Sequence, residues 1–148
     1  METLTRDFTA TTFVVQGGRT LLIYHKKIRM WLPPGGHIHP NELPCDAAVR
    51  EVREETGLEV ELLSPPSEIG PVRVLAQPVC ILLERIEEGH EHIDLIYFGR
   101  AVGGELIPCV QETEGCRWCT AQDLDSSDIA EDIRILGKRA IEAAGKPT

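Results

Sequence analysis

The stretch that most constrains this chain runs from Gly36 to Leu58 and ends in an acidic predicted helix. An α-helix turns about 100° per residue, so glutamates at i, i+3 and i+4 within residues 43–56 share one stripe. They are Glu51, Glu54 and Glu55. Like charges at this spacing repel by roughly a few tenths of a kcal/mol per pair, and the helix dipole is already negative in the last turns. We therefore expect the stripe to hold a cation, and its oxygen ligands favour Mg²⁺ or Mn²⁺.

The rest of this predicted helix has an apolar side for docking on a sheet. Its members are Cys45, Ala48, Val49, Val52 and Thr56. Arg50 lies four residues before Glu54 and within reach of Glu42, so we expect it to orient carboxylates. Gly57 suits the left-handed position that ends a helix.

The fixed positions of the stretch form a longer pattern. It reads Gly36, five residues, Glu42, seven residues, Arg50-Glu51-Val52, one residue, Glu54-Glu55, one residue, Gly57-Leu58. This pattern resembles the Nudix box of the Nudix hydrolases, a loop-helix-loop that binds a divalent metal and cleaves a nucleoside diphosphate linked to another group X. The segments 31–36 (WLPPGG) and 117–124 (RWCTAQDL) are also family-like.

The resemblance implies roles for the residues of the box. By position, the metal ligands would be the Gly36 carbonyl and the side chains of Glu51, Glu54 and Glu55, while Arg50 and Glu42 would support them. A carboxylate must then take the proton of the attacking water. Our first choice for this base is Glu54. The second is Glu112 or Glu114, because some Nudix enzymes carry the base on a loop in this region.

The leading prediction is a metal-dependent hydrolase that cleaves a diphosphate linkage in a nucleoside di- or triphosphate derivative by water attack at phosphorus. The alternative is a non-catalytic, nucleotide-sensing Nudix domain. Such domains typically lose box glutamates, and all are present here. A third class is a zinc-dependent interaction module built on Cys109, Cys116 and Cys119, although a structural zinc site needs four ligands and a second CxxC is absent.

Five residues outside the acidic stripe are candidates for substrate binding. Lys27 and Arg29 belong to a basic loop that either is simply solvated or contacts a substrate phosphate. His37 enters the box and is a candidate for the phosphates. His92 and Asp94 share one face of a predicted strand, where they form either its exposed end or the lining of a substrate cleft.

Composition limits the partners of the chain. A net charge of −9 argues against nonspecific binding to nucleic acid or to an anionic membrane. A phosphorylated small molecule stays compatible, because a bound cation reverses the sign locally. The N-terminus lacks the pattern of a secretory signal, so we expect a cytoplasmic location. The family resemblance leaves a homodimer open, and the sequence shows no exposed apolar stripe that would require one.

The predicted fold is a single Nudix domain over residues 1–148, of the α/β (α+β) class. A mixed β-sheet should lie between the box helix and a C-terminal helix, as a three-layer α/β/α sandwich. We expect a hairpin from 8–16 and 19–25, a strand at 58–63, a loop at 67–73, and strands at 72–87 and 92–102. The last helix should be capped by Ser127 or Asp128 and end near Ala144.

Overall fold

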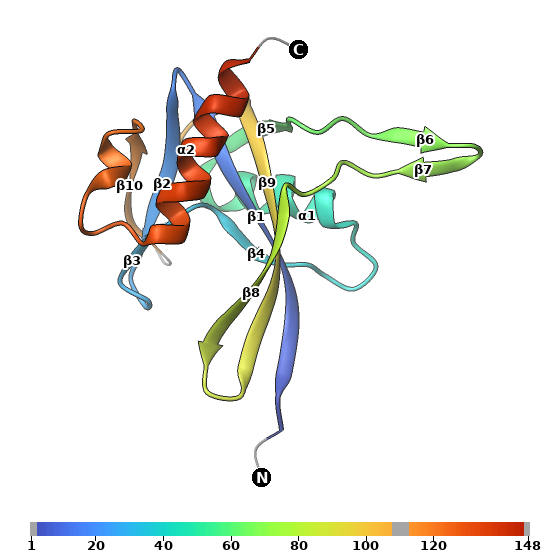
Figure 1. Ribbon diagram of the computed structural model, residues 1–148, viewed down its shortest axis with the longest axis horizontal. Helices are drawn as coiled ribbons and strands as arrows, with labels where there is room; N and C mark the ends of the chain where they lie inside the picture. Colours follow the sequence, from blue (N-terminus) through green and yellow to red (C-terminus); the bar gives the residue numbers. More distant parts are fainter. Residues whose placement is uncertain (1–2, 108–112, 147–148) are drawn as a thin grey trace.

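The computed structural model describes residues 3–107 and 113–146, which fold into a twisted mixed sheet with a helix on each face (Figure 1). The elements are β1 (Thr5–Gln16), β2 (Arg19–His25), β3 (Met30–Leu32), β4 (Gly35–His37), α1 (Pro44–Thr56), β5 (Leu58–Leu62), β6 (Ser67–Ile69), β7 (Val72–Val74), β8 (Cys80–Glu87), β9 (His90–Gly104), β10 (Thr113–Cys119), the 3₁₀ turn η1 (Asp123–Asp125) and α2 (Glu131–Gly145). Neither α-helix is long and apolar enough to cross a membrane.

Two long strands form the centre of the sheet. β1 and β9 pair in parallel from Thr5 opposite His90 to Val15 opposite Arg100. β2, β4, β5 and β8 extend the sheet by antiparallel pairing with one of these two strands. The predicted hairpin is confirmed, since β1 turns into β2 at Gly17 and Gly18, which both have positive φ. The sheet is mixed, as predicted.

Successive side chains of β1 point to opposite faces of the sheet, so the hydrophobic core has a part on each face. Phe13 and Val15 belong to the cluster that contains Ile133 and Leu136 of α2. Val14 points to the other face, where it shares a cluster with Val52 of α1. Because successive side chains of a strand alternate, the two helices cover opposite faces, which confirms the three layers (Figure 1).

The box helix α1 has the predicted boundaries and lies close to the sheet. Ala47 and Ala48 are buried in one cluster with Ala10 and Tyr97, and these small side chains allow the close approach. Gly57 has a φ of 80°, and its N–H donates to the Arg53 carbonyl, which ends the helix as predicted.

Three local predictions are wrong. Residues 67–73 do not form a plain loop, because β6 and β7 pair as a separate hairpin that projects from the main sheet (Figure 1). The predicted strand 72–87 is broken between β7 and β8, where Pro78 has no N–H for a ladder. Helix α2 begins three residues later than Asp128, with Ala130 as N-cap, since Ile129 is buried in the core and Ser126 bonds to Asp128 in a turn.

The central strands extend past the helix that covers one face. Phe8, Ile81 and Leu83 are exposed there. Phe8 and Leu83 both pair with Ile93, so they lie in one row across the sheet. This exposed row is not apparent from the sequence. Its cause is the projecting end of the β1–β9–β8 ribbon, a tertiary feature (Figure 1).

Candidate active site

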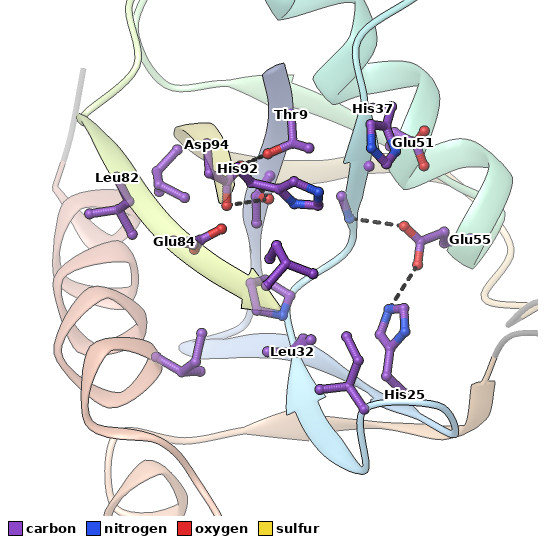
Figure 2. Close-up of a pocket in the computed structure, with 18 of the residues that line it drawn as sticks. Thr9, His25, Leu32, His37, Glu51, Glu55, Leu82, Glu84, His92 and Asp94 are labelled. Atoms are coloured by element: carbon purple, nitrogen blue, oxygen red, sulfur yellow. Dashed lines mark hydrogen bonds and ion pairs between the residues drawn. The ribbon is translucent and has the colours of Figure 1, made fainter. Parts of the chain in front are cut away.

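A cavity of about 690 Å³ lies between the α2 face of the sheet and the box. Glutamates Glu51 and Glu55 line one wall, and apolar side chains such as Phe13, Leu32 and Leu136 line another (Figure 2). This volume and this mixture of an apolar surface with a few polar groups are typical of a site for a small organic ligand. The cavity is therefore the candidate active site.

Two glycines of β4 let the helix glutamates reach this cavity. A Cβ added at Gly36 would lie 2.6 Å from Cδ of Glu51, so that carboxylate rests directly on the glycine backbone. The Gly35 N–H donates to Oε1 of Glu55 at 2.9 Å. Glu55 is only 4% exposed, and its Oε2 lies 3.9 Å from Nε2 of His25. A side chain at Gly36 would displace the Glu51 carboxylate, whereas a side chain at Gly35 would collide with Ala10 and Thr11 of β1.

Arg50 connects the carboxylates of the box. Its Nε and Nη2 donate to the two oxygens of Glu42 at 2.7 and 3.0 Å. Its Nη1 donates both to Glu51 at 2.9 Å and to Glu54 at 3.1 Å. The paired guanidinium lowers the pKa of Glu42 to about 2. The predicted reach of Arg50 toward Glu42 and Glu54 is confirmed, and its bond to the His37 carbonyl also fixes the entry to the box.

Arg50 joins two carboxylates of the acidic stripe, Glu51 and Glu54, but the side-chain oxygens of Glu51, Glu54 and Glu55 do not all lie within 4.8 Å of one another. Glu51 and Glu54 share one nitrogen of Arg50, although the Glu54 side chain is 56% exposed and does not line the cavity. Glu51, Glu55 and the Gly36 backbone form a set of oxygen donors at the cavity wall. Hard oxygen ligands of this kind fit Mg²⁺ or Mn²⁺.

Two carboxyl groups that line the same cavity, Asp94 and Glu84, lie close together. Asp94 is 5% exposed and accepts hydrogen bonds from Thr9 at 2.9 Å and Thr11 at 2.8 Å (Figure 2). Glu84 is hydrogen-bonded to Asp94, and burial together with the neighbouring carboxylate raises the pKa of Glu84. Burial also raises the pKa of Asp94. The pair therefore retains a proton at neutral pH and can both donate and accept hydrogen bonds.

Sequence reasoning placed Asp94 beside a cleft but missed Glu84. The sequence of residues 80–87 does contain an indication of Glu84, because Leu82 and Glu84 are two residues apart and so share one face of a strand. An acid therefore occupies a position that faces inward. It was not sufficient by itself, since the partner of Glu84 depends on the pairing of β8 with β9.

Of the other predicted substrate-binding residues, the structure places some in the cavity lining and one outside it. Lys27, His37 and His92 line the cavity, whereas Arg29 lies in the turn before β3 with a φ of 59° and is not part of the lining. The His37 and His92 rings are 5.1 Å apart between centroids. Burial, followed by the neighbouring His37 and His90, lowers the pKa of His92, so this imidazole is held neutral.

The remaining predicted residues lie near or on β10. Glu112 and Cys109 fall outside the described residues, and Glu114 lies within the strand. Cys116 packs with Val14 and Cys119 with Phe13, on opposite faces of the sheet. These two thiols cannot ligate one ion, and burial raises the pKa of each. The structure therefore does not bring the zinc module together at Cys116 and Cys119.

Known proteins resemble this chain over most of its length. The NUDIX domain family model matches residues 5–139. A NUDIX family hydrolase structure from Clostridium perfringens is 33% identical, with a TM-score of 0.85 over 95% of this chain and 99% of that chain. A Bacillus subtilis protein provisionally named an 8-oxo-dGTP diphosphatase is 32% identical over 114 residues, or 75% of this chain and 66% of that protein.

A shorter match covers a quarter of the chain. A mouse asymmetrical bis(5′-nucleosyl)-tetraphosphatase is 49% identical over 37 residues, which are 25% of either chain. The chain thus spans less than two thirds of the length of these curated relatives. The family match, in contrast, runs through the whole sheet and into α2. Box, fold and matched span together show that the chain belongs to the Nudix hydrolase family.

Proposed function

We propose that this protein is a Mg²⁺- or Mn²⁺-dependent pyrophosphohydrolase that cleaves a diphosphate linkage in a nucleoside di- or triphosphate derivative by water attack at phosphorus. The observation that carries the proposal is one cavity with the Glu51 and Glu55 carboxylates on one wall and a mixed apolar and carboxyl surface on another. This arrangement suits a ligand with a charged phosphate end and a planar, partly polar end.

The box residues would hold the ion and position the reactants. Gly36, Glu51, Glu54 and Glu55 are the proposed ligands, and a bound divalent ion would neutralise phosphate charge and acidify water. Arg50 keeps Glu51 and Glu54 together through one nitrogen. Glu54 remains our proposed general base, because its exposed carboxylate can rotate away from Arg50 without leaving a buried group unpaired. Glu112 and Glu114 are the competing candidates.

The rest of the cavity would select the substrate. Lys27 supplies positive charge for the phosphates. Leu32 and Leu82, which line the cavity and are only partly buried, offer apolar surface for a nucleobase. The proton shared by Glu84 and Asp94 lets their carboxyls hydrogen-bond with both donors and acceptors on the edge of this base. The names of the relatives, an 8-oxo-dGTP diphosphatase and a dinucleoside tetraphosphatase, also indicate nucleotide substrates.

A nucleotide panel tests the proposal. Purified protein is incubated with Mg²⁺ and nucleoside triphosphates, 8-oxo-dGTP, dinucleoside tetraphosphates and nucleotide sugars, and released phosphate, pyrophosphate and mononucleotide are measured. We expect hydrolysis of at least one compound, its loss in EDTA, and a decrease in kcat of about 100-fold or more in Glu51→Gln. The matched control is Glu61→Gln, an exposed glutamate on β5, which should retain wild-type turnover.

Two results would contradict the proposal. Nucleotide binding without turnover of any compound would favour the sensing domain. Turnover that persists in EDTA or in Glu51→Gln would show that the box glutamates do not support the reaction.

A further inference from the structure

We propose that Asp7, His37 and His92 form a second metal site, specific for a divalent ion that prefers imidazole, such as Zn²⁺. The site is distinct from the oxygen ligands of the box, and the inference does not depend on the hydrolysis proposed above. Among the described residues, these three form the one group of three or more His, Cys, Asp or Glu side chains whose ligand atoms all lie within 4.8 Å of one another.

Three neighbouring strands bring the group together. Asp7 of β1 pairs with His92 of β9, and His37 of β4 pairs with Thr9, two residues further along β1. Asp7 and Thr9 are short side chains, so the two imidazoles can approach each other above the strand between them. Figure 2 shows the His37 and His92 rings turned toward the same space in the cavity. The positions are fixed by sheet pairing and not by a loop.

The donor set determines the class of ion. Two imidazole nitrogens and one carboxylate oxygen suit Zn²⁺ and similar borderline ions, whereas Mg²⁺ prefers oxygen ligands and keeps several waters. Nε2 of His37 already lies 3.1 Å from Oδ2 of Asp7, so their polar atoms point at each other. Three protein ligands also leave a coordination position open.

His90 supplies a supporting partner for the carboxylate. Its Nε2 lies 3.3 Å from Oδ2 of Asp7, and its Nδ1 is 2.8 Å from Oγ1 of Thr5. Groups that orient a ligand in this way are a regular part of metal sites and strengthen the affinity. Asp7 therefore lies between His37 and His90, with its orientation fixed from both sides.

The two sites can be separated experimentally because they share no side chain. Glu51 is hydrogen-bonded to Arg50, and none of its described hydrogen bonds or ion pairs involves His37, His92 or Asp7. His37 and His92 nevertheless line the same cavity as Glu51 and Glu55. An ion on the histidines would therefore face a ligand held in the cavity.

The test is a titration of metal-free protein with Zn²⁺ in buffer that contains excess Mg²⁺, followed by calorimetry. We expect one Zn²⁺ per chain. His37→Asn and His92→Asn should each weaken this binding at least about tenfold, since even the loss of an orienting partner lowers affinity by about 10–100-fold. The matched control is His39→Asn, an exposed histidine two residues from His37 that lies outside the group. It should bind Zn²⁺ like the wild type, and so should Glu51→Gln.

A second readout identifies the ligands. Co²⁺ replaces Zn²⁺ and gives visible absorption bands that should disappear in His92→Asn, while circular dichroism confirms that the variant is folded. The proposal is overturned if Zn²⁺ affinity is unchanged in both histidine variants, or if Glu51→Gln abolishes the binding and so places the ion in the box.

Discussion

Arg50 shows how a single side chain changes the electrostatics of the box. The acidic stripe alone predicts a cation, and part of that positive charge is supplied by this guanidinium, which contacts Glu42, Glu51 and Glu54. The pKa of Glu42, lowered to about 2, shows how strongly its charged form is held. Glu55 lies outside this network, bound to the Gly35 N–H. One guanidinium cannot balance all these carboxylates, so the argument for a divalent ion persists.

The first prediction concerns Glu84 and pH. Burial and Asp94 raise the pKa of Glu84 in the folded chain from 4.5 to about 8. The folded state thus binds a proton that the unfolded state releases, so stability from this group is present below about pH 4.5 and is lost as pH rises through about 8. Glu84→Gln keeps a neutral side chain at every pH. We expect equal stability near pH 4 and a gain of about 1 kcal/mol near pH 8, allowing for partial exposure.

Thermal unfolding measured from pH 4 to pH 8 checks this expectation. A gain of about 1 kcal/mol corresponds to a rise in Tm of roughly 2–4 °C for a domain of this size. Glu61→Gln on β5 is the control, because it makes the same substitution at an exposed carboxylate away from Asp94. A Glu84→Gln curve that stays parallel to the wild-type curve over the whole range would refute the shared proton.

Sequence patterns predicted those strands and helices whose ends are determined by neighbouring residues. The turn of the first hairpin and the end of α1 lie where expected, because Gly17-Gly18 and Gly57 end their segments. Strand β1 begins at Thr5, three residues before its predicted start. The pairs Asp94–Thr9 and Asp7–His92 join residues 85 positions apart. They depend on the parallel pairing of β1 with β9, and the Glu84–Asp94 pair depends on the pairing of β8 with β9. No short stretch of sequence specifies either pairing, so neither the histidine group nor the Glu84 pair could be predicted.

The second prediction concerns the end of α1. Gly57 has a φ of 80°, and a Cβ there would lie 2.2 Å from the Glu105 carbonyl oxygen. Gly18 has a similar φ of 76° with nothing within 4 Å of an added Cβ. Alanine at either position costs about 1–2 kcal/mol for the left-handed backbone. Gly57→Ala must in addition displace the chain after β9. We expect it to lower the free energy of unfolding clearly more than Gly18→Ala.

Urea denaturation of both variants measures the difference. Because the backbone conformation is matched, the excess cost in Gly57→Ala reports the contact between the helix end and the segment after β9. If both variants lose the same free energy of unfolding, the segment after β9 moves away from the added methyl group without cost, and the prediction is wrong.

At the scale of the whole molecule, the net charge of −9 says little about the ligand. Two acids of the box, Glu51 and Glu55, line one cavity, where a bound cation would make the local charge suitable for phosphate. The layered fold creates this cavity. The sheet supplies its floor, α2 contributes an apolar wall, and Gly36 of β4 leaves room for the Glu51 carboxylate.

The last prediction follows from this concentration of charge. An ion that binds only the folded chain stabilises it by about 2.7 kcal/mol at a hundred times its Kd, which corresponds to a rise in Tm on the order of 5–10 °C. We expect Mg²⁺ to raise the Tm of the wild type by this amount in the absence of nucleotide. NaCl at matched ionic strength should give a much smaller shift, since it only screens charges. Glu51→Gln should lose most of the Mg²⁺ shift, whereas His92→Asn should keep it, because the histidine group is not the magnesium site. If Glu51→Gln responds to Mg²⁺ like the wild type, the ion is stabilising the protein somewhere other than the box.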